Sequence, residues 1–400
     1  MTINTRDLAR FLDQVGGELD IPPKKYQDAV DRYTRVGKRI EGGTYSGSSG
    51  PPSICPQESF RLGTVVRPIR DGIEAAYDID LVSELSILKA STTPKTVKHM
   101  VGDRLEENGT YARLLTDEGK RCWTLEYAEE DGIGFHLDVL PAVPDPVGLL
   151  DTSIAITNNA DGVYSWSASN PRGYGAWFDR CNAAAFAHIA PTRKLEIFTA
   201  TPGVYARVDD VPDPLVRTPL QRAIQIMKRH RDMRFNQRQR LPYAPISIVI
   251  TTLAASLYNN GADVYSALTA IVGKLQAHAS LVHGVPKSQA VAAGDLIQRM
   301  PDGRWYIGNP TNPKENFADR WHEDNHARAI AFFAWVEAIA EDLAYLARET
   351  NATRLKERLA RALGGAPVAA CFATLIRPAV AAPAAVPRIQ ITSTPKPWRS

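Results

Sequence analysis

A chain of 400 residues, 44% hydrophobic and 23% charged, has ample material for a buried core in one two-lobed unit or two domains. A net charge of +3 is too small to indicate a nucleic-acid-binding protein by itself. The four cysteines show neither metal-ligand spacing nor a disulfide framework, so reduced thiols and a cytoplasmic location are expected. The longest apolar run, 246–257, is too short to cross a bilayer, and no membrane partner is expected.

The first half of the chain begins with two expected helices and continues with short strands. Apolar residues at helical spacing predict helices over 6–20 and over Tyr26–Ile40, and a Gly/Ser/Pro loop follows at 42–52. Short β-like runs then dominate as far as about Phe198, with one helical run at 95–105 between them. The expected strands are 64–66, 76–82, 122–127, 134–143 and 163–166.

The second half of the chain is predicted to be nearly all helical, and this change from strands to helices indicates a domain boundary. The expected helices are 220–235, 246–257, 262–282, 325–348 and 352–363. From Gly364 the sequence is rich in Ala and Pro, and we expect it to be poorly ordered apart from 389–391. The expected domains are therefore a core at 1–200, a helical domain at 201–365 and a tail at 366–400.

Acidic residues alternate along one expected strand and recur on a second. Asp78 and Asp80 share one face of an extended segment while Ile79 and Leu81 face the core, and Asp138 lies on the second strand. Alternating acids also occur on solvated strand faces, so the pair alone is a weak signal. If the strands pair, three carboxylates converge, which is costly without a neutralising cation. Oxygen ligands of this kind favour Mg²⁺ or Mn²⁺, and two such ions serve nucleotidyl transfer.

The segment before the acidic pair reads as a short helical turn that ends at a glycine. Ser59 opens this turn with a hydroxyl group and free backbone N–H groups, which suit a phosphate. Gly63 and Thr64 then lead toward the strand. No Gly-Lys-Ser/Thr follows a Gly-rich run, so the segment is not a P-loop. A turn, a glycine and a strand with Asp-x-Asp form a compact arrangement for a triphosphate and a metal.

Several segments together resemble one family, the cGAS/DncV-like nucleotidyltransferases of bacterial antiphage (CBASS) systems. The similarity runs from the helix near Tyr26 to about Trp321. The segments are 59–68 (SFRLGTVVRP), 77–82 (YDIDLV), 136–141 (HLDVLP), 169–171, 177–178, 228–231, 245–248 and 315–317. The resemblance implies an α+β fold with a polymerase-β-like core, a mixed sheet with helices, and a C-terminal helical bundle. The two lobes are expected to enclose a central cleft.

The same resemblance implies contacts to the nucleotide. It suggests that Gln57, Ser59, Lys228 and Ser247 bind the nucleotide and its phosphates, and that 309–317 edges the pocket. For Ser247, helix capping and phosphate contact remain equal alternatives. The family's usual Gly-Ser is Glu58-Ser59 here, which adds a carboxylate near the phosphates and removes the backbone freedom of glycine.

A basic segment at 222–240 allows two further interpretations. Its arginines and lysine either form a solvated basic face or, apart from Lys228, a surface for an activating nucleic acid. Three other residues could have a functional role, but ordinary packing in the fold is the preferred interpretation for them. It accounts for His136 on its strand and for the aromatic pair Trp177 and Phe178.

The resemblance also implies an activity. Asp78, Asp80 and Asp138 would hold two Mg²⁺ (or Mn²⁺) ions, and a ribose hydroxyl would attack the α-phosphorus of ATP or another NTP with release of pyrophosphate. The expected product is a cyclic oligonucleotide second messenger in antiviral signalling, and a HORMA-type protein is a candidate activator. The alternatives are a linear oligoadenylate synthase, an RNA-end nucleotidyltransferase, and an inactive nucleotide-binding regulator.

Overall fold

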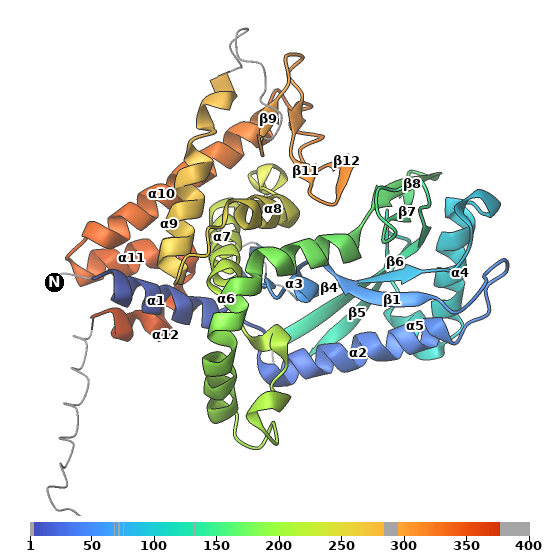
Figure 1. Ribbon diagram of the computed structural model, residues 1–400, viewed down its shortest axis with the longest axis horizontal. Helices are drawn as coiled ribbons and strands as arrows, with labels where there is room; N and C mark the ends of the chain where they lie inside the picture. The colour runs from blue at the N-terminus through green and yellow to red at the C-terminus, as the bar shows by residue number, and fades with distance from the viewer. Residues whose placement is uncertain are drawn as a thin grey trace, which may run out of the picture.

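The computed structural model describes residues 4–67, 69–70, 73–74, 76–130, 133–283 and 295–376. These residues form two lobes (Figure 1). One is built on a mixed sheet and is called the sheet lobe here, and the other is the helical lobe. A cavity lined by residues of both lobes lies between them. The expected α+β class and central cleft are therefore confirmed.

The described residues contain one six-stranded sheet, and its central strands are the two that carry the predicted aspartates. The strand order is β1-β4-β6-β7-β8, with β5 pairing to the first part of β6. β4 and β6 run parallel, and the other neighbours are antiparallel. The strands are β1 Ser53–Gln57, β4 Tyr77–Glu84, β5 Trp123–Glu130, β6 Ile133–Pro144, β7 Ile154–Ala160 and β8 Val163–Ser169.

Three helices complete the sheet lobe and bury one face of its sheet. α2 (Pro23–Glu41) and α4 (Pro94–Glu106) bury Val36 and Val101, and α5 (Gly109–Leu114) packs beside them. Along β4, Tyr77, Ile79 and Leu81 enter this core. Since side chains alternate along a strand, Asp78 and Asp80 face the opposite side. The sequence pattern alone predicted this division.

The helical lobe gathers helices from both ends of the chain around one core. α7 carries a capping box in which Thr218 and Gln221 satisfy each other's backbone N–H groups, with Pro219 at the first position. The helices of this lobe are α1 Thr5–Glu18, α7 Pro219–Phe235, α8 Ser247–Leu257, α9 Val264–Gln276, α10 Ala327–Arg348, α11 Ala352–Leu363 and α12 Gly365–Ile376. None of the helices in the described part of the chain is both long and apolar enough to span a membrane.

Short elements fill the connections. They are the helix α3 at Glu58–Leu62, the hairpin β2 Ile69–Arg70 with β3 Ile73–Glu74, and the pairs β9 Gln298–Arg299 with β10 Trp305–Tyr306 and β11 Gly308–Asn309 with β12 Asn312–Asn316. The 3₁₀ turns are Lys89–Ser91, Val208–Asp210, Asp213–Leu215, Leu241–Tyr243 and Ala279–His283.

The long helix α6 (Pro171–Ala200) corrects the expectation of β-like runs as far as residue 198. Asn170 caps its start by accepting a hydrogen bond from the Gly173 N–H group, and Pro171 occupies the first position. The following alanine-rich sequence favours helix. Phe178 is buried in the helical lobe and Trp177 packs against the same core, as expected for packing residues.

The chain ends differ from the expected domains. α1 was assigned to the core at 1–200, but Leu8, Phe11 and Leu12 pack in the helical lobe because their apolar stripe faces α7, α9 and α12. The tail expected from residue 366 instead continues as α12, whose Cys371 and Phe372 are buried in the same core. Residues 377–400, with the segment 389–391 that was excepted from the poorly ordered tail, lie outside the described residues. The expected strand at 64–66 is not formed, and these residues have no regular secondary structure.

Candidate active site

The candidate site is built on a row of residues that crosses four neighbouring strands in register. Gln57 on β1 pairs with Asp80 on β4, Asp80 pairs with Asp138 on β6, and Asp138 pairs with Thr124 on β5. Asp78 lies two residues before Asp80 and beside His136. Directly paired residues on adjacent strands stand about 5 Å apart at Cβ. The strand pairing that the sequence argument required is present.

The three aspartates have different surroundings. Asp138 accepts a hydrogen bond of 2.6 Å from the hydroxyl of Thr124. Asp78 is half exposed, and its Oδ1 lies 3.7 Å from Nδ1 of His136. Burial raises the pKa of Asp80 well above its ordinary value, and the nearby carboxylates of Glu58, Asp138 and Asp78 raise it further. A cation would stabilise a carboxylate that is surrounded by like charges, and Asp80 is the carboxylate in this position.

The carboxylates of Asp78, Asp80 and Asp138 suit a divalent metal ion in their chemistry. They offer only oxygen atoms as ligands, and a divalent ion would relieve their mutual repulsion. In the residues that the structure describes, however, no three His, Cys, Asp or Glu side chains are already arranged to hold an ion. One oxygen of Asp138 accepts from Thr124, and Asp78 is half exposed and lies beside His136. The strand register therefore brings the three aspartates together, but their carboxylates are not already arranged around a metal position.

Glu58 adds a fourth carboxylate that the sequence analysis noted only as a departure from the family. It is the first residue of α3 and has a left-handed backbone with φ of 51°, a conformation uncommon outside glycine. Burial raises its pKa, Lys228 opposes that shift, and Asp138 and Asp78 add to it. Its side chain remains accessible inside the cavity described below. We call Glu58, Asp78, Asp80 and Asp138 the acidic cluster.

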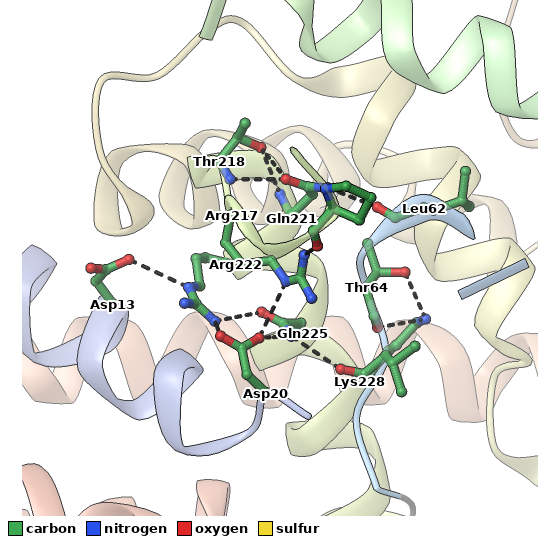
Figure 2. Close-up of polar contacts among 12 residues, drawn as sticks. Asp13, Asp20, Leu62, Thr64, Arg217, Thr218, Gln221, Arg222, Gln225 and Lys228 are labelled. Carbon is green, nitrogen blue, oxygen red and sulfur yellow. Dashed lines mark hydrogen bonds and ion pairs between the residues drawn. The ribbon is translucent and has the colours of Figure 1, made fainter. Parts of the chain in front are cut away.

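Helix α7 fixes the segment that follows α3 through three side chains on one face. Gln221 donates to the Leu62 carbonyl at 2.8 Å, and Gln225 donates to the Val65 carbonyl at 3.0 Å. Lys228 donates to the carbonyl and the hydroxyl oxygen of Thr64 at 3.1 and 3.2 Å. Figure 2 shows the contacts of Gln221 and Lys228 to this segment. The spacing of three and four residues places all three donors on the same helix face.

Lys228 is therefore a buried residue in this structure. Only 2% of it is exposed, and it does not line the cavity. Burial and the adjacent Arg231 lower its pKa to about 7, while Glu58 and other carboxylates oppose the shift. Its contact to phosphate remains a prediction, and its observed role is to hold Thr64 beside the acidic cluster.

The basic segment is not simply a solvated face, because several of its members point inward. Arg222 forms salt bridges to Asp13 at 3.5 Å and Asp20 at 2.8 Å, and these also appear in Figure 2. Arg229 reaches Glu74 at 2.8 Å. Only the C-terminal end of the segment, from Arg234 to Arg240, is mostly exposed. Ion pairs within the protein thus account for much of the charge run.

A cavity of about 920 Å³ between the lobes reaches the acidic cluster. Gln57 and Glu58 line it from the sheet side, and Arg231, Ser247 and Phe317 line it from the helical side. Its size is within the usual range for small-molecule sites. We call it the first cavity. Of the acidic cluster only Glu58 lines the first cavity, and Ser59, Lys228 and the three aspartates are not among its lining residues.

Ser247 is placed at the cavity but is not a helix cap. It is the first residue of α8, and the cap position belongs to Ile246, which offers no side-chain hydrogen bond. The Ser247 hydroxyl accepts from the guanidinium of Arg231 at 3.0 Å, and the same group donates to the Pro245 carbonyl at 3.1 Å. The structure therefore sets aside the capping interpretation, and the phosphate contact remains a prediction.

Two cations at the cavity were missed by the sequence analysis. Arg121, just before β5, and Lys314, on β12, line the cavity, and neither side chain forms a hydrogen bond or salt bridge to the described residues. A single basic residue beside or on a short strand carries no sequence signal of its own. The connector at 309–317 does edge the cavity, as expected, with Asn309 donating to Glu315 at 2.8 Å.

This combination of a mixed sheet, in-register acids and an interlobe cavity defines a polymerase-β-like nucleotidyltransferase fold. No model of a known protein family matches the sequence. The chain is 30% identical over 268 residues to a c-di-GMP synthase of Roseivirga ehrenbergii, an alignment that covers 67% of the chain. The chain spans 61% of the length of that relative.

Solved structures show the same fold over almost the whole chain. The CD-NTase CdnG of Bradyrhizobium diazoefficiens in complex with GTP has a TM-score of 0.68 at 21% identity, covering 92% of this chain and 99% of that one. CdnC of Escherichia coli MS115-1 with ATP has a TM-score of 0.58 at 16% identity, covering 90% and 98%. The Escherichia coli DncV form bound to 3'-deoxy GTP has a TM-score of 0.56 at 14% identity, covering 88% and 94%. These structures have the fold that the resemblance to the cGAS/DncV-like nucleotidyltransferases implied.

Proposed function

We propose that this chain is a cyclic oligonucleotide synthase that transfers nucleotidyl groups from nucleoside triphosphates and releases pyrophosphate. The observation that carries the proposal is the register of Asp80 against Asp138 on parallel strands beside the first cavity. A regulator that only binds nucleotide has no need for acids that repel one another so strongly. The named activity of the Roseivirga relative supports a cyclic product.

The residues have separable roles in this proposal. Asp78, Asp80 and Asp138 would hold two Mg²⁺ or Mn²⁺ ions, which when bound stabilise the charge on the entering and leaving oxygens. Asp138 would also orient or deprotonate the attacking ribose hydroxyl, and Thr124 fixes that carboxylate through its 2.6 Å hydrogen bond. Gln57 and Ser247 face the cavity where a nucleotide would lie. Ser59 and Lys228 would support the phosphate side, Lys228 through the Thr64 turn.

The substrates are proposed as purine triphosphates, with GTP tested beside ATP. A neighbour of the same fold is bound to GTP, another is bound to ATP, and the curated relative is named for a guanine product. Arg121 and Lys314 are available in the described structure to neutralise phosphate charge at the cavity wall. We propose antiviral signalling in the cytoplasm as the setting. CdnC has been solved with a HORMA protein, and a HORMA-type activator is proposed as a partner on that basis. An activating nucleic acid is proposed as an alternative partner because the segment from Arg234 to Arg240 is basic and mostly exposed.

The test is incubation of the purified protein with the four labelled NTPs and Mg²⁺, with products identified by mass spectrometry. We expect pyrophosphate and a small product that resists phosphatase. Asp80→Ala and Asp138→Ala should abolish both signals while the variants remain folded. Retained pyrophosphate release in these variants would remove the acidic cluster from the mechanism.

The alternatives give different products in the same assay. A linear oligoadenylate synthase gives chains that keep a phosphatase-sensitive end, and an RNA-end nucleotidyltransferase labels added RNA. An inactive regulator releases no pyrophosphate with any NTP, with or without a candidate activator.

A further inference from the structure

A second cavity of about 450 Å³ lies on the helical lobe, on the other side of α7 from the first. Its walls come from the C-terminal turn of α7, the segment after it, α10 and α11. Arg231 and Asp232 of α7 line the first cavity, whereas His230 and Arg234 line the second. A single helix therefore separates the two cavities.

The second cavity is strongly basic. Four arginines line it, Arg234, Arg240, Arg358 and Arg361, against two acids, Glu341 and Asp342. Arg358 is neutralised by Asp342, with Nε 2.5 Å from Oδ1. Glu341 is 64% exposed and reaches only Arg358, at 4.0 Å. The other three guanidinium groups form no hydrogen bond or salt bridge to any residue that the structure describes.

The histidine at the base of the cavity does not add to this charge. The indole N–H of Trp335 donates to Nδ1 of His230 at 3.1 Å, so Nδ1 must be the unprotonated nitrogen. Nε2 then carries the proton and donates to Asp342 at 3.0 Å. Oδ2 of Asp342 thus accepts from His230 and Oδ1 accepts from Arg358, and among the described residues Asp342 makes no contact to Arg234, Arg240 or Arg361. The cavity keeps a net positive charge of about two, counting Glu341 as ionised.

We propose that the second cavity is a binding site for a small oligophosphate anion of the pyrophosphate class. Guanidinium groups match phosphate oxygens in paired hydrogen bonds, and three of them converge on one hollow of suitable size. The described lining contains no Trp, Tyr or Phe, and its most numerous polar groups are guanidinium groups, which match phosphate oxygens. The phosphate part of a ligand, rather than a base, is what this site recognises. The proposal does not depend on the activity of the first cavity.

The test is calorimetric titration of the full-length protein with pyrophosphate, in low-salt buffer with EDTA so that metal-dependent binding elsewhere is suppressed. The double variant Arg234→Ala/Arg361→Ala should weaken binding at least about tenfold, because each lost guanidinium removes charge-assisted hydrogen bonds. Arg234→Lys/Arg361→Lys keeps the charge and should lose less. Both arginines are exposed, so the variants should melt like the wild type.

Two matched controls decide where the anion binds. Arg238 is exposed on the same segment but does not line the cavity, so Arg238→Ala should leave the affinity unchanged. Arg121→Ala removes a cation of the first cavity and should also leave it unchanged. The proposal is wrong if the wild type binds no pyrophosphate, if Arg238→Ala weakens binding as much as the double variant, or if only Arg121→Ala does. It is equally wrong if a single-stranded RNA displaces pyrophosphate and Arg238→Ala weakens the RNA binding, since that describes a general basic surface.

Discussion

The ammonium group of Lys228 donates at once to the carbonyl oxygen of Thr64, at 3.1 Å, and to its hydroxyl, at 3.2 Å. These two bonds join α7 of the helical lobe to the turn that ends α3 in the sheet lobe. Glu58 begins that same short helix and points into the first cavity. The position of the acidic cluster relative to the helical lobe therefore depends on a buried cation whose pKa is about 7.

Replacing this cation should change how stability depends on pH. The folded-state pKa of Lys228 is lowered from 10.5 to about 7, so between these values the unfolded chain binds a proton that the folded chain does not. The wild type thus gains stability from this residue as pH rises from 7 to 10. Lys228→Met lacks that gain and leaves the Thr64 carbonyl without its donor. We expect a small deficit below pH 7 that grows to roughly 1–3 kcal/mol near pH 10.

The measurement is urea unfolding of both proteins between pH 6 and pH 10 without divalent ions. Lys24, an exposed lysine of α2, supplies the matched control, and Lys24→Met should follow the wild-type profile. A deficit for Lys228→Met that stays constant over this range would show that Lys228 does not titrate as described.

Asp80 should show the opposite pH dependence, because its folded-state pKa is raised rather than lowered. As pH rises from its ordinary value of 3.8 through the folded pKa, the folded chain must hold a charge that it disfavours, and stability falls. Asp80→Asn removes that charge. Without metal, the variant should equal the wild type near pH 4 and exceed it at pH 8 by roughly 0.5–2 kcal/mol, and it should be inactive in the proposed reaction.

Added Mg²⁺ should then raise the melting temperature of the wild type at pH 8 and not that of Asp80→Asn, because a ligand stabilises the state that binds it. Asp78→Asn is the comparison, and since Asp78 is half exposed its metal-free gain should be smaller. Identical melting of wild type and Asp80→Asn at both pH values would mean that the carboxylates do not repel one another in the folded protein.

Local patterns in the sequence were sufficient to predict much of the candidate active site. Alternation along 77–82 fixed which face Asp78 and Asp80 share, and helix 352–363 matches its predicted bounds. The residue pattern also placed Asp138 on a second expected strand, and convergence of the three carboxylates was predicted on condition that the two strands pair. Alternation could not show that Asp80 and Asp138 are direct neighbours, because register depends on contacts between segments about 60 residues apart.

The unpredicted features arise from tertiary contacts. A lysine in a basic run gives no sign that its ammonium group will be buried against Thr64, and the Glu58 backbone conformation has no signature in residue type. α6 was missed because Gly173 and Gly175 weaken local helix propensity in its first turns, and packing of Tyr174 and Phe178 overrides it. The order of 365–376 likewise comes from packing against α1.

Thr124 should act as a positioning residue for Asp138. Thr124→Val keeps the shape of the side chain but removes the 2.6 Å hydrogen bond that fixes the carboxylate. In the proposed reaction we expect kcat to fall about tenfold and the Mg²⁺ requirement to rise, as for other residues that orient metal ligands. Thr124→Ser restores the hydroxyl and should recover most of both. If Ser and Val give the same loss, packing of the methyl group and not the hydrogen bond is responsible.

Two substitutions of Glu58 separate the effect of its strained backbone from the effect of its charge at the first cavity. Its φ of 51° costs a non-glycine residue about 1 kcal/mol, and its carboxylate faces the space where a triphosphate would lie. Glu58→Gly removes both effects and Glu58→Gln only the charge. We expect both variants to lower KM for the NTP at low salt and to gain stability from the lost charge, with Glu58→Gly gaining about 1 kcal/mol more than Glu58→Gln in unfolding free energy. Initial rates and urea unfolding measure the two effects separately. A higher KM in Glu58→Gln would show that the carboxylate assists substrate binding, and a stability gain as large in Gln as in Gly would assign the cost to charge and not to the backbone.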